Sequence, residues 1–254
     1  MAVAQPGQVG RVRAAWRLAR GLACVAQGLA TCAVLFPFLD LDGRTRRVRA
    51  FSLRMLRALG VRLAVEGTAQ PGPVMLVANH VSWLDILAIN AAHTARFVSK
   101  AEIRHWPLLG WMVQCGGTLF IERARKRDAM RVVHQVSAAL SAGDVVAVFP
   151  EGTTGDGRGL LPFHANLIQA AVALDAPVQG VALRYADDAA AVSAAAAYTG
   201  DITLWRSLWA VVHARGLVAR VTLLAPERSG GRERRAFCEG IRTRIAQALE
   251  GTAP

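Results

Sequence analysis

The sequence predicts an α/β fold with a largely parallel sheet flanked by helices, preceded by an N-terminal membrane-embedded or interfacial helical segment. Short apolar runs alternate with amphipathic stretches over most of the chain, which is typical of strands joined by crossover helices. The 254 residues are enough for one large buried core, and a long uncharged run lies near the N-terminus. We therefore expect an N-terminal membrane-associated helical region over residues 1–60 and a main domain over residues 61–254.

Composition limits the classes of protein to which the chain can belong. Hydrophobic residues make up 53% and charged residues 19%, which excludes intrinsic disorder. The net charge of +12 comes almost wholly from arginine and indicates an acidic partner, either nucleic acid or an anionic membrane. An aromatic content of 6% offers little for base stacking, so we expect membrane lipids and no nucleic acid. The four cysteines show no C-x-x-C spacing, which argues against a disulfide scaffold or a cysteine-based zinc site and fits a reducing compartment.

The first expected element is an uncharged run at residues 21–39. Its nineteen residues approach the ~20 apolar residues that a membrane span needs. Four arginines precede it and four follow it, at positions 11, 13, 17, 20, 44, 46, 47 and 49. A single span would carry one of these groups across the membrane, against the positive-inside tendency. The run is therefore expected to dip into the membrane and return, or to lie in its interface.

The next element is an amphipathic helix over residues 48–61. Apolar residues at helical spacing share one face and arginines the other, as in a basic interfacial helix; the apolar set is Phe51, Met55, Leu56 and Leu59, and the basic set Arg54 and Arg57. Two alternatives stay open. The stretch could be a core helix of the main domain, or the N-terminal region could be a cleaved signal peptide, although no convincing A-x-A site ends the apolar run.

Expected strands and helices then alternate to the C-terminus. Compact apolar runs predict strands at residues 74–78, 97–99, 118–121, 145–149, 178–183 and 217–224. Apolar residues at helical spacing predict helices at residues 85–92, 107–114, 128–143, 163–174, 204–213 and 237–251. Pro107 favours a first helical turn, Asp128 can cap a helix, and Gly143 can end one. Residues 186–197 are alanine-rich and predict a surface loop or a short helix.

The end of the strand at residues 74–78 carries the first candidate site. In a parallel sheet, sites form where strands lead into helices. His80 suits a general base at neutral pH, and Asp85 could fix its tautomer and stabilise the imidazolium. The two side chains can meet only if His80 lies in the turn before the helix, and Ser82 is a good N-cap for that helix. Alternatively, Ser82 and Asp85 form a capping box and His80 is an ordinary loop residue.

Three further strand ends offer groups for an anion. The strand before Arg123 ends in a guanidinium that could bind a phosphate or carboxylate, and Lys100 is a similar candidate. Glu151, Gly152 and Thr153 follow a buried strand and open a glycine-rich loop, whose backbone could approach an anion closely. No Gly-Lys-Ser/Thr follows, so the loop is not a P-loop. Solvated charges and a plain surface loop are the alternatives.

Taken together and in this order, these motifs resemble the glycerolipid acyltransferase family, which includes the bacterial 1-acylglycerol-3-phosphate acyltransferases. The N-H-x-x-x-x-D motif matches Asn79, His80 and Asp85, and the other two motifs match Gly117, Phe120, Ile121 and Arg123, and residues 149–153. A fourth, proline-containing strand motif is matched only loosely at residues 176–183. The chain departs from the family pattern in two places on the acceptor side. Thr154 and Gly155 stand where arginine and serine are common, and residues 160–169 lack a basic residue, although Arg158 lies nearby.

The resemblance implies a membrane-bound acyltransferase catalytic domain over residues 61–254, on the cytoplasmic face of a bacterial inner membrane. It would move a fatty acyl group from acyl-CoA or acyl carrier protein to the sn-2 hydroxyl of 1-acylglycerol-3-phosphate (lysophosphatidic acid), giving phosphatidic acid in phospholipid synthesis. A thioester is already activated, so no cofactor, metal or covalent enzyme intermediate is required. Another lysolipid acceptor, such as lyso-ornithine lipid, and a non-catalytic lipid-binding protein with this fold are the alternatives.

The resemblance also implies roles for individual residues. His80 would be the catalytic base and Asp85 would orient it. Arg123 would bind the anionic head group of the acceptor, with Lys100 and the segment Glu151, Gly152 and Thr153 as second choices. Asn79, counted among the substrate-binding residues, would fix the loop that carries His80.

Overall fold

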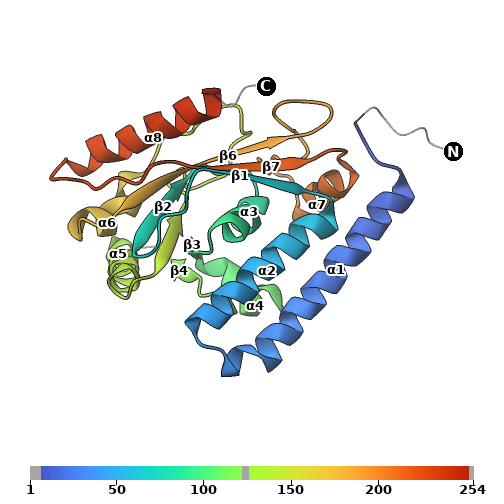
Figure 1. Ribbon diagram of the computed structural model, residues 1–254, viewed down its shortest axis with the longest axis horizontal. Coiled ribbons are helices and arrows are strands. Elements are labelled where there is room, and N and C mark those ends of the chain that lie inside the picture. The colour runs from blue at the N-terminus through green and yellow to red at the C-terminus, as the bar shows by residue number, and fades with distance from the viewer. Residues whose placement is uncertain (1–6, 122–125, 252–254) are drawn as a thin grey trace.

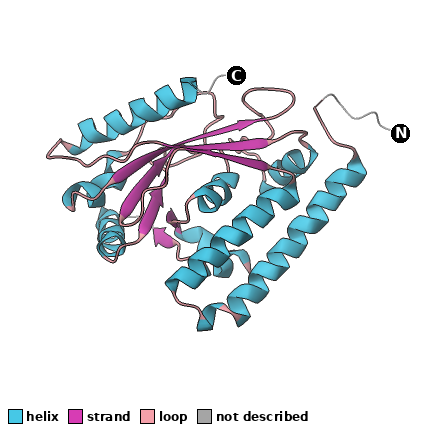
Figure 2. Cartoon of the chain, in the orientation of Figure 1, coloured by secondary structure: helices cyan, strands magenta, loops and turns pink. Residues whose placement is uncertain are grey.

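A seven-stranded sheet forms the centre of the protein (Figure 1, Figure 2). The structure is a computed structural model that describes residues 7–121 and 126–251. The strand order is β1-β7-β6-β2-β5-β3-β4, and all neighbours are parallel except β6 and β7. The strands are β1 Arg62–Glu66, β2 Val74–Ala78, β3 Arg96–Lys100, β4 Leu119–Ile121, β5 Val145–Val148, β6 Val178–Ala186 and β7 Val218–Leu223. The expected α/β fold with a largely parallel sheet is therefore confirmed.

Helices cover both faces of the sheet (Figure 1). One core contains apolar side chains of α1, α2, α3 and α7, and the other contains those of α5, α6 and α8. The short helix α4 contacts α1. The bounds are α1 Arg11–Val34, α2 Leu41–Leu59, α3 Leu84–Ala92, α4 Leu109–Cys115, α5 Lys126–Ser141, α6 Gln169–Ala173, α7 Leu204–His213 and α8 Arg234–Gly251, with 3₁₀ turns η1 Phe36–Phe38, η2 Ala101–His105 and η3 Ala165–Ile168.

The N-terminal region is a hairpin of two helices, α1 and α2, joined by η1 (Figure 1). The Asp40 carboxylate starts α2 by accepting a hydrogen bond from the Gly43 N–H at 2.7 Å, and Gly60 ends it in the left-handed conformation. The buried stripe of α1 consists largely of small residues, which lets the helices approach closely, while its outward face exposes Val12, Trp16, Leu22 and Val34. Among the described residues, no helix has the length and apolar character needed to cross a bilayer.

Two interpretations of this region differ from the structure. The apolar face predicted to contact lipid from α2 lies in the core, where Met55, Leu56 and Leu59 are buried, so the core-helix alternative describes that face. Arg17 is not a flanking surface charge. It is 7% exposed, and its Nη1 donates to the carbonyls of Val212 and Ala214 at the end of α7, at 2.9 and 2.7 Å. The exposed apolar face of the hairpin thus belongs to α1.

Most other predicted elements are present, with a few differences. No local pattern predicted β1, an edge strand that is largely exposed and pairs with β7. The helix expected at residues 163–174 is only η3 followed by α6. α5 begins at Lys126, so the helix starts before Asp128 rather than at it. The alanine-rich segment at residues 186–197 is not wholly at the surface, because Ser193 and Ala196 are buried.

Candidate active site

His80 and Asp85 form a hydrogen-bonded pair at the carboxyl end of β2. His80 lies in the turn between β2 and α3, and its Nδ1 is 2.8 Å from the Asp85 Oδ2. The two side chains can meet only if His80 lies in the turn before the helix, and this is where it lies. The Asp85 side chain is fully buried, whereas that of His80 is 20% exposed. A carboxylate on Nδ1 selects the tautomer with a proton on Nδ1, which leaves the Nε2 lone pair free to accept a proton.

The carboxylate of Asp85 is held by three further donors. Oδ2 accepts the backbone N–H groups of Val81 and Ser82 at 2.7 and 2.9 Å, and Oδ1 accepts the Tyr185 hydroxyl at 2.7 Å. Tyr185 is buried in β6, and burial together with the adjacent Asp85 carboxylate raises its pKa well above the ordinary value. The phenol therefore stays protonated as a donor. Sequence reasoning missed Tyr185, because only the pairing of β6 with β2 brings it to the site.

Ser82 does not cap α3 as the sequence suggested. The N-cap residue is Trp83, and the Ser82 Oγ is buried without a hydrogen-bond partner in the described part of the chain. From the first turn of α3, the Asp85 carboxylate instead accepts the N–H groups of the two residues before Trp83. The same carboxylate thus holds the turn before the helix and binds His80, which ties the position of the imidazole to the start of α3.

Glu151 and Phe149 hold His80 from the neighbouring strand β5. The rings of Phe149 and His80 stack with centroids 4.0 Å apart. The Glu151 carboxylate is buried and accepts the backbone N–H groups of His80 at 2.8 Å and Leu161 at 3.0 Å. Burial raises the pKa of Glu151. Both of its oxygens bind backbone donors, so Glu151 holds the His80 loop in place in this structure.

Asn79 also has a local role. Its side-chain amide exchanges two hydrogen bonds with the backbone of Leu183 in β6, at 3.0 and 2.7 Å. The residue is buried, and these hydrogen bonds continue the pairing of β2 with β6 beyond the end of β2. This arrangement anchors the residue before His80 to β6 and leaves the amide occupied by the backbone.

The other predicted groups lie at the same edge of the sheet, as far as the structure describes them. Lys100 ends β3 and residues 151–153 follow β5, and both strands run parallel to β2 in the central part of the sheet. Thr153 is exposed, and Gly152 adopts the left-handed conformation. The side chain of Lys100 and the whole of Arg123 lie outside the described part of the chain. At the departure from the family pattern, the Thr154 hydroxyl donates to the carbonyl of Tyr198.

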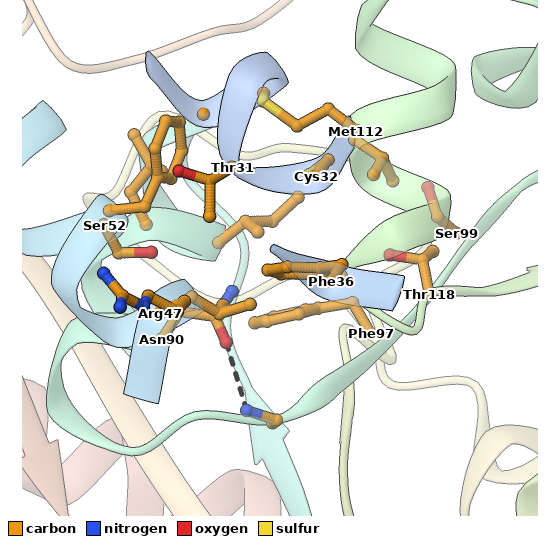
Figure 3. A pocket seen from close by; sticks show the side chains of 18 of the residues that line it. Thr31, Cys32, Phe36, Arg47, Ser52, Asn90, Phe97, Ser99, Met112 and Thr118 are labelled. Atoms are coloured by element: carbon orange, nitrogen blue, oxygen red, sulfur yellow. Dashed lines mark hydrogen bonds between the residues drawn. The ribbon is translucent and has the colours of Figure 1, made fainter. Parts of the chain in front are cut away.

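An apolar cavity of about 180 Å³ lies between the N-terminal hairpin, α3, β3 and α4 (Figure 3). Phe36, Phe97 and Met112 are among its walls, and Thr31 faces it from α1 (Figure 3). Phe97 also stacks on Phe149, with centroids 5.8 Å apart, and Phe149 stacks on His80. The cavity therefore begins two aromatic rings away from the imidazole. Its lining comes from many separate segments, so no spacing in the sequence could have indicated it.

Comparisons with known proteins agree with this geometry. The family model described as Acyltransferase matches residues 62–184. A 1-acyl-sn-glycerol-3-phosphate acyltransferase of Neisseria meningitidis is 41% identical over 71% of each chain, and a lyso-ornithine lipid O-acyltransferase of Pseudomonas aeruginosa is 35% identical over 96% of each chain. The crystal structure of the 1-acyl-sn-glycerophosphate acyltransferase from Thermotoga maritima has the same fold, with a TM-score of 0.62 at 21% identity over 94% of this chain and 99% of that one. The chain belongs to the acyltransferase family.

Proposed function

We propose that the chain is a membrane-bound O-acyltransferase that moves a fatty acyl group from acyl-CoA or acyl carrier protein to the sn-2 hydroxyl of 1-acylglycerol-3-phosphate, giving phosphatidic acid. The observation that carries this proposal is the His80–Asp85 pair beside an apolar cavity. Residues 61–254 would form the catalytic domain, and residues 1–60 a membrane-associated hairpin at the cytoplasmic face of a bacterial inner membrane. The outward apolar face of α1 and the return of the chain through α2 support that placement.

In the proposed reaction, His80 Nε2 accepts the proton of the acceptor hydroxyl while the hydroxyl oxygen attacks the thioester carbonyl. Asp85 stabilises the imidazolium that forms. When the tetrahedral intermediate collapses, the carbon–sulfur bond breaks and the imidazolium returns its proton to the departing thiolate. General base catalysis of this kind contributes about 10²–10⁴-fold. The products are the acylated lipid and a free thiol, and no cofactor takes part.

The apolar cavity is the proposed site for an acyl chain. Its walls are mostly carbon, and each buried methylene contributes about 0.8 kcal/mol. Phe97, one wall of the cavity, is linked to His80 through the ring of Phe149, while Thr31 lines the cavity from α1 (Figure 3). In the proposed binding mode the acyl chain enters past Phe97, and only a long chain reaches Thr31.

Filling the far side of the cavity should change chain-length preference. Thr31→Phe is expected to lower kcat/KM for long acyl groups more than for short ones, because the added ring excludes the last methylenes from the cavity. Measuring kcat/KM across a series of acyl thioesters checks this. Thr45→Phe, on the exposed surface of α2, is the matched control and should leave the preference unchanged. An equal loss for all chain lengths would show that the cavity does not hold the chain.

Arg123 is the proposed ligand of the acceptor phosphate, with Lys100 and the backbone of residues 152 and 153 as supporting groups. Arg123→Ala should raise the KM for lysophosphatidate by about tenfold or more and leave the KM for the acyl donor nearly unchanged, because a charge-assisted hydrogen bond is worth about 1.5–3 kcal/mol. Steady-state kinetics with each substrate varied in turn measures both constants. Arg127→Ala, four residues further along the chain, is the control. Equal effects on donor and acceptor would make Arg123 a structural residue.

Lyso-ornithine lipid is a second candidate acceptor, and two observations favour it. The Pseudomonas relative named for that acceptor matches this chain over almost its whole length. Thr154 stands where an arginine is common in the family. It offers no positive charge to a phosphate, and its hydroxyl donates to the Tyr198 carbonyl. Supplying lysophosphatidate and lyso-ornithine lipid together, with acyl-CoA or acyl carrier protein, tests the proposal. Phosphatidic acid as the main product supports it, and acylation of the ornithine lipid alone would replace it with the second candidate.

Tyr185 is a proposed positioning residue that acts through Asp85. Tyr185→Phe removes the donor to Oδ1 and should lower kcat by about tenfold with little change in KM, because the bond involves a charged acceptor. Tyr198→Phe is the control, since Tyr198 contacts its neighbours through its backbone. A role in stability alone would lower the melting temperature of Tyr185→Phe without changing kcat or its pH profile in the folded enzyme, and that result would contradict the assignment.

A further inference from the structure

Five of the six tryptophans expose much of their surface. The exposed fractions are 64% for Trp16, 44% for Trp106, 42% for Trp111, 59% for Trp205 and 45% for Trp209. The sixth, Trp83, is partly buried and donates its indole N–H to the Ser207 Oγ at 3.0 Å. Large aromatic side chains are normally buried, so exposure on this scale indicates a contact surface. We call the five exposed residues the tryptophan surface.

The tryptophan surface is carried by α1 and by two segments that contact α1. The C-terminal end of α7, the helix of Trp205 and Trp209, binds the start of α1 through Arg17 and through the Val9 N–H, which donates to the His213 carbonyl at 2.8 Å. Residues 106–111 lead into α4, which contacts α1 further along its length. These helices lie on the side of the sheet opposite α5, α6 and α8 (Figure 1). The exposed indoles therefore extend over one side of the molecule, beyond the hairpin itself.

Exposed arginines lie next to these tryptophans. Arg13 and Arg20 are one turn from Trp16 on α1, Arg206 adjoins Trp205 on α7, and Arg104 precedes Trp106. An indole combines an apolar body with a polar N–H and favours the boundary between water and hydrocarbon, where arginines can reach lipid phosphates. Neighbouring anionic lipids attract such arginines electrostatically. The combination fits the surface of an anionic bilayer.

We propose that α7 and residues 106–111 contact an anionic bilayer together with α1, so that the enzyme docks through three segments rather than through its hairpin alone. This inference rests on the proposed membrane-bound function and adds to it the orientation of the catalytic domain. α7 is tied to the turn that carries His80, because Trp83 at the start of α3 donates its indole N–H to Ser207 of α7. Docking through α7 would therefore place the turn that carries His80 close to the lipid surface from which the acceptor comes.

Vesicle binding of the full-length chain tests this inference. Trp205→Ala/Trp209→Ala should bind vesicles of phosphatidylethanolamine and phosphatidylglycerol on the order of tenfold more weakly than the wild type, because two apolar contacts with lipid are lost. Its acyl transfer to detergent-dispersed acceptor should stay at the wild-type level. Met130→Ala/Leu174→Ala removes two exposed apolar side chains from α5 and the end of α6, and should not change vesicle binding. Unchanged affinity of the tryptophan variant, or an equal loss in the control, overturns the inference.

A second measurement does not depend on weakening the α7 contact. In Trp16→Phe the hairpin carries no tryptophan, so any quenching by vesicles with brominated acyl chains must come from the other segments. We expect strong quenching of tryptophan emission in this variant. In Trp16→Phe/Trp205→Phe/Trp209→Phe most of this quenching should be lost, and only the quenching of Trp106 and Trp111 should remain. Unquenched emission from vesicle-bound Trp16→Phe would show docking by the hairpin alone. Failure of acyl transfer by the wild type in detergent would contradict the proposed function and would leave the quenching result unaffected.

Discussion

Replacing His80 by alanine is expected to lower kcat by about 10³–10⁴-fold or more while the fold and vesicle binding persist. In the proposed reaction the imidazole accepts the proton of the acceptor hydroxyl, since Asp85 binds its Nδ1 and selects the tautomer with a free Nε2. Its side chain is partly exposed, so the substitution leaves no large internal cavity. The rate of thiol release in the presence of acceptor, measured on purified protein, gives kcat directly.

His134→Ala is the matched control for this change. His134 lies exposed on α5, in the layer on the other side of the sheet, and its loss should leave kcat unchanged. Circular dichroism and a melting curve establish that the His80→Ala protein is folded. A folded His80→Ala protein that keeps more than about a tenth of the wild-type rate would show that another group accepts the proton.

Asp85→Asn should lower kcat by about 10³–10⁴-fold with little change in KM. The amide has almost the same shape as the carboxylate. The amide oxygen can keep the contacts of Oδ2 with His80, Val81 and Ser82. The Tyr185 hydroxyl can rotate to accept a hydrogen bond from the amide NH₂ group. The backbone turn can therefore survive. What disappears is the negative charge that stabilises the imidazolium.

The pair can be tested as a unit by combining the two changes. If Asp85 acts only through His80, the His80→Ala/Asp85→Asn protein should be no slower than His80→Ala alone. Asp201→Asn, at an exposed position before α7, is the control for a lost carboxylate charge. Additive losses in the double variant would mean that Asp85 contributes by a route independent of the imidazole.

The central part of the sheet and the contact between His80 and Asp85 could be predicted from the sequence for physical reasons. β2 is buried along its whole length and therefore appears as a continuous apolar run, and His80 and Asp85 follow it close together in sequence. Edge elements were harder to predict. β1 is largely exposed, and its pairing with β7 joins residues far apart in the chain, so no local pattern revealed it.

The amphipathic pattern of α2 shows a different limit of sequence reasoning. A basic helix with one apolar face fits both an interfacial helix and a core helix, and here Met55, Leu56 and Leu59 pack against the rest of the protein. α1 reverses the usual arrangement, with small residues inside and large apolar residues outside. Arg17 was similarly ambiguous, because its role depends on the end of α7, almost two hundred residues later.

The positioning network around His80 could be predicted only in part. The motif identified Asn79, His80, Asp85 and Glu151, but their partners Leu183, Tyr185 and Leu161 come from other segments and carry no recognisable spacing. Sheet order brings these partners together, since β6, β2 and β5 are neighbours whose carboxyl ends meet at one edge. The assignment of Tyr185 as a partner of Asp85 therefore required the fold.

The central claim is that this chain transfers an acyl group from a thioester to a lysolipid hydroxyl with His80 as the base. The most direct measurement follows free thiol and acylated lipid together, in one reaction that contains purified enzyme, acyl-CoA or acyl carrier protein, and lysophosphatidate. We expect equimolar thiol and phosphatidic acid from the wild type, and neither above background from His80→Ala. Thiol release without an acylated lipid, or equal product from the two proteins, would contradict it.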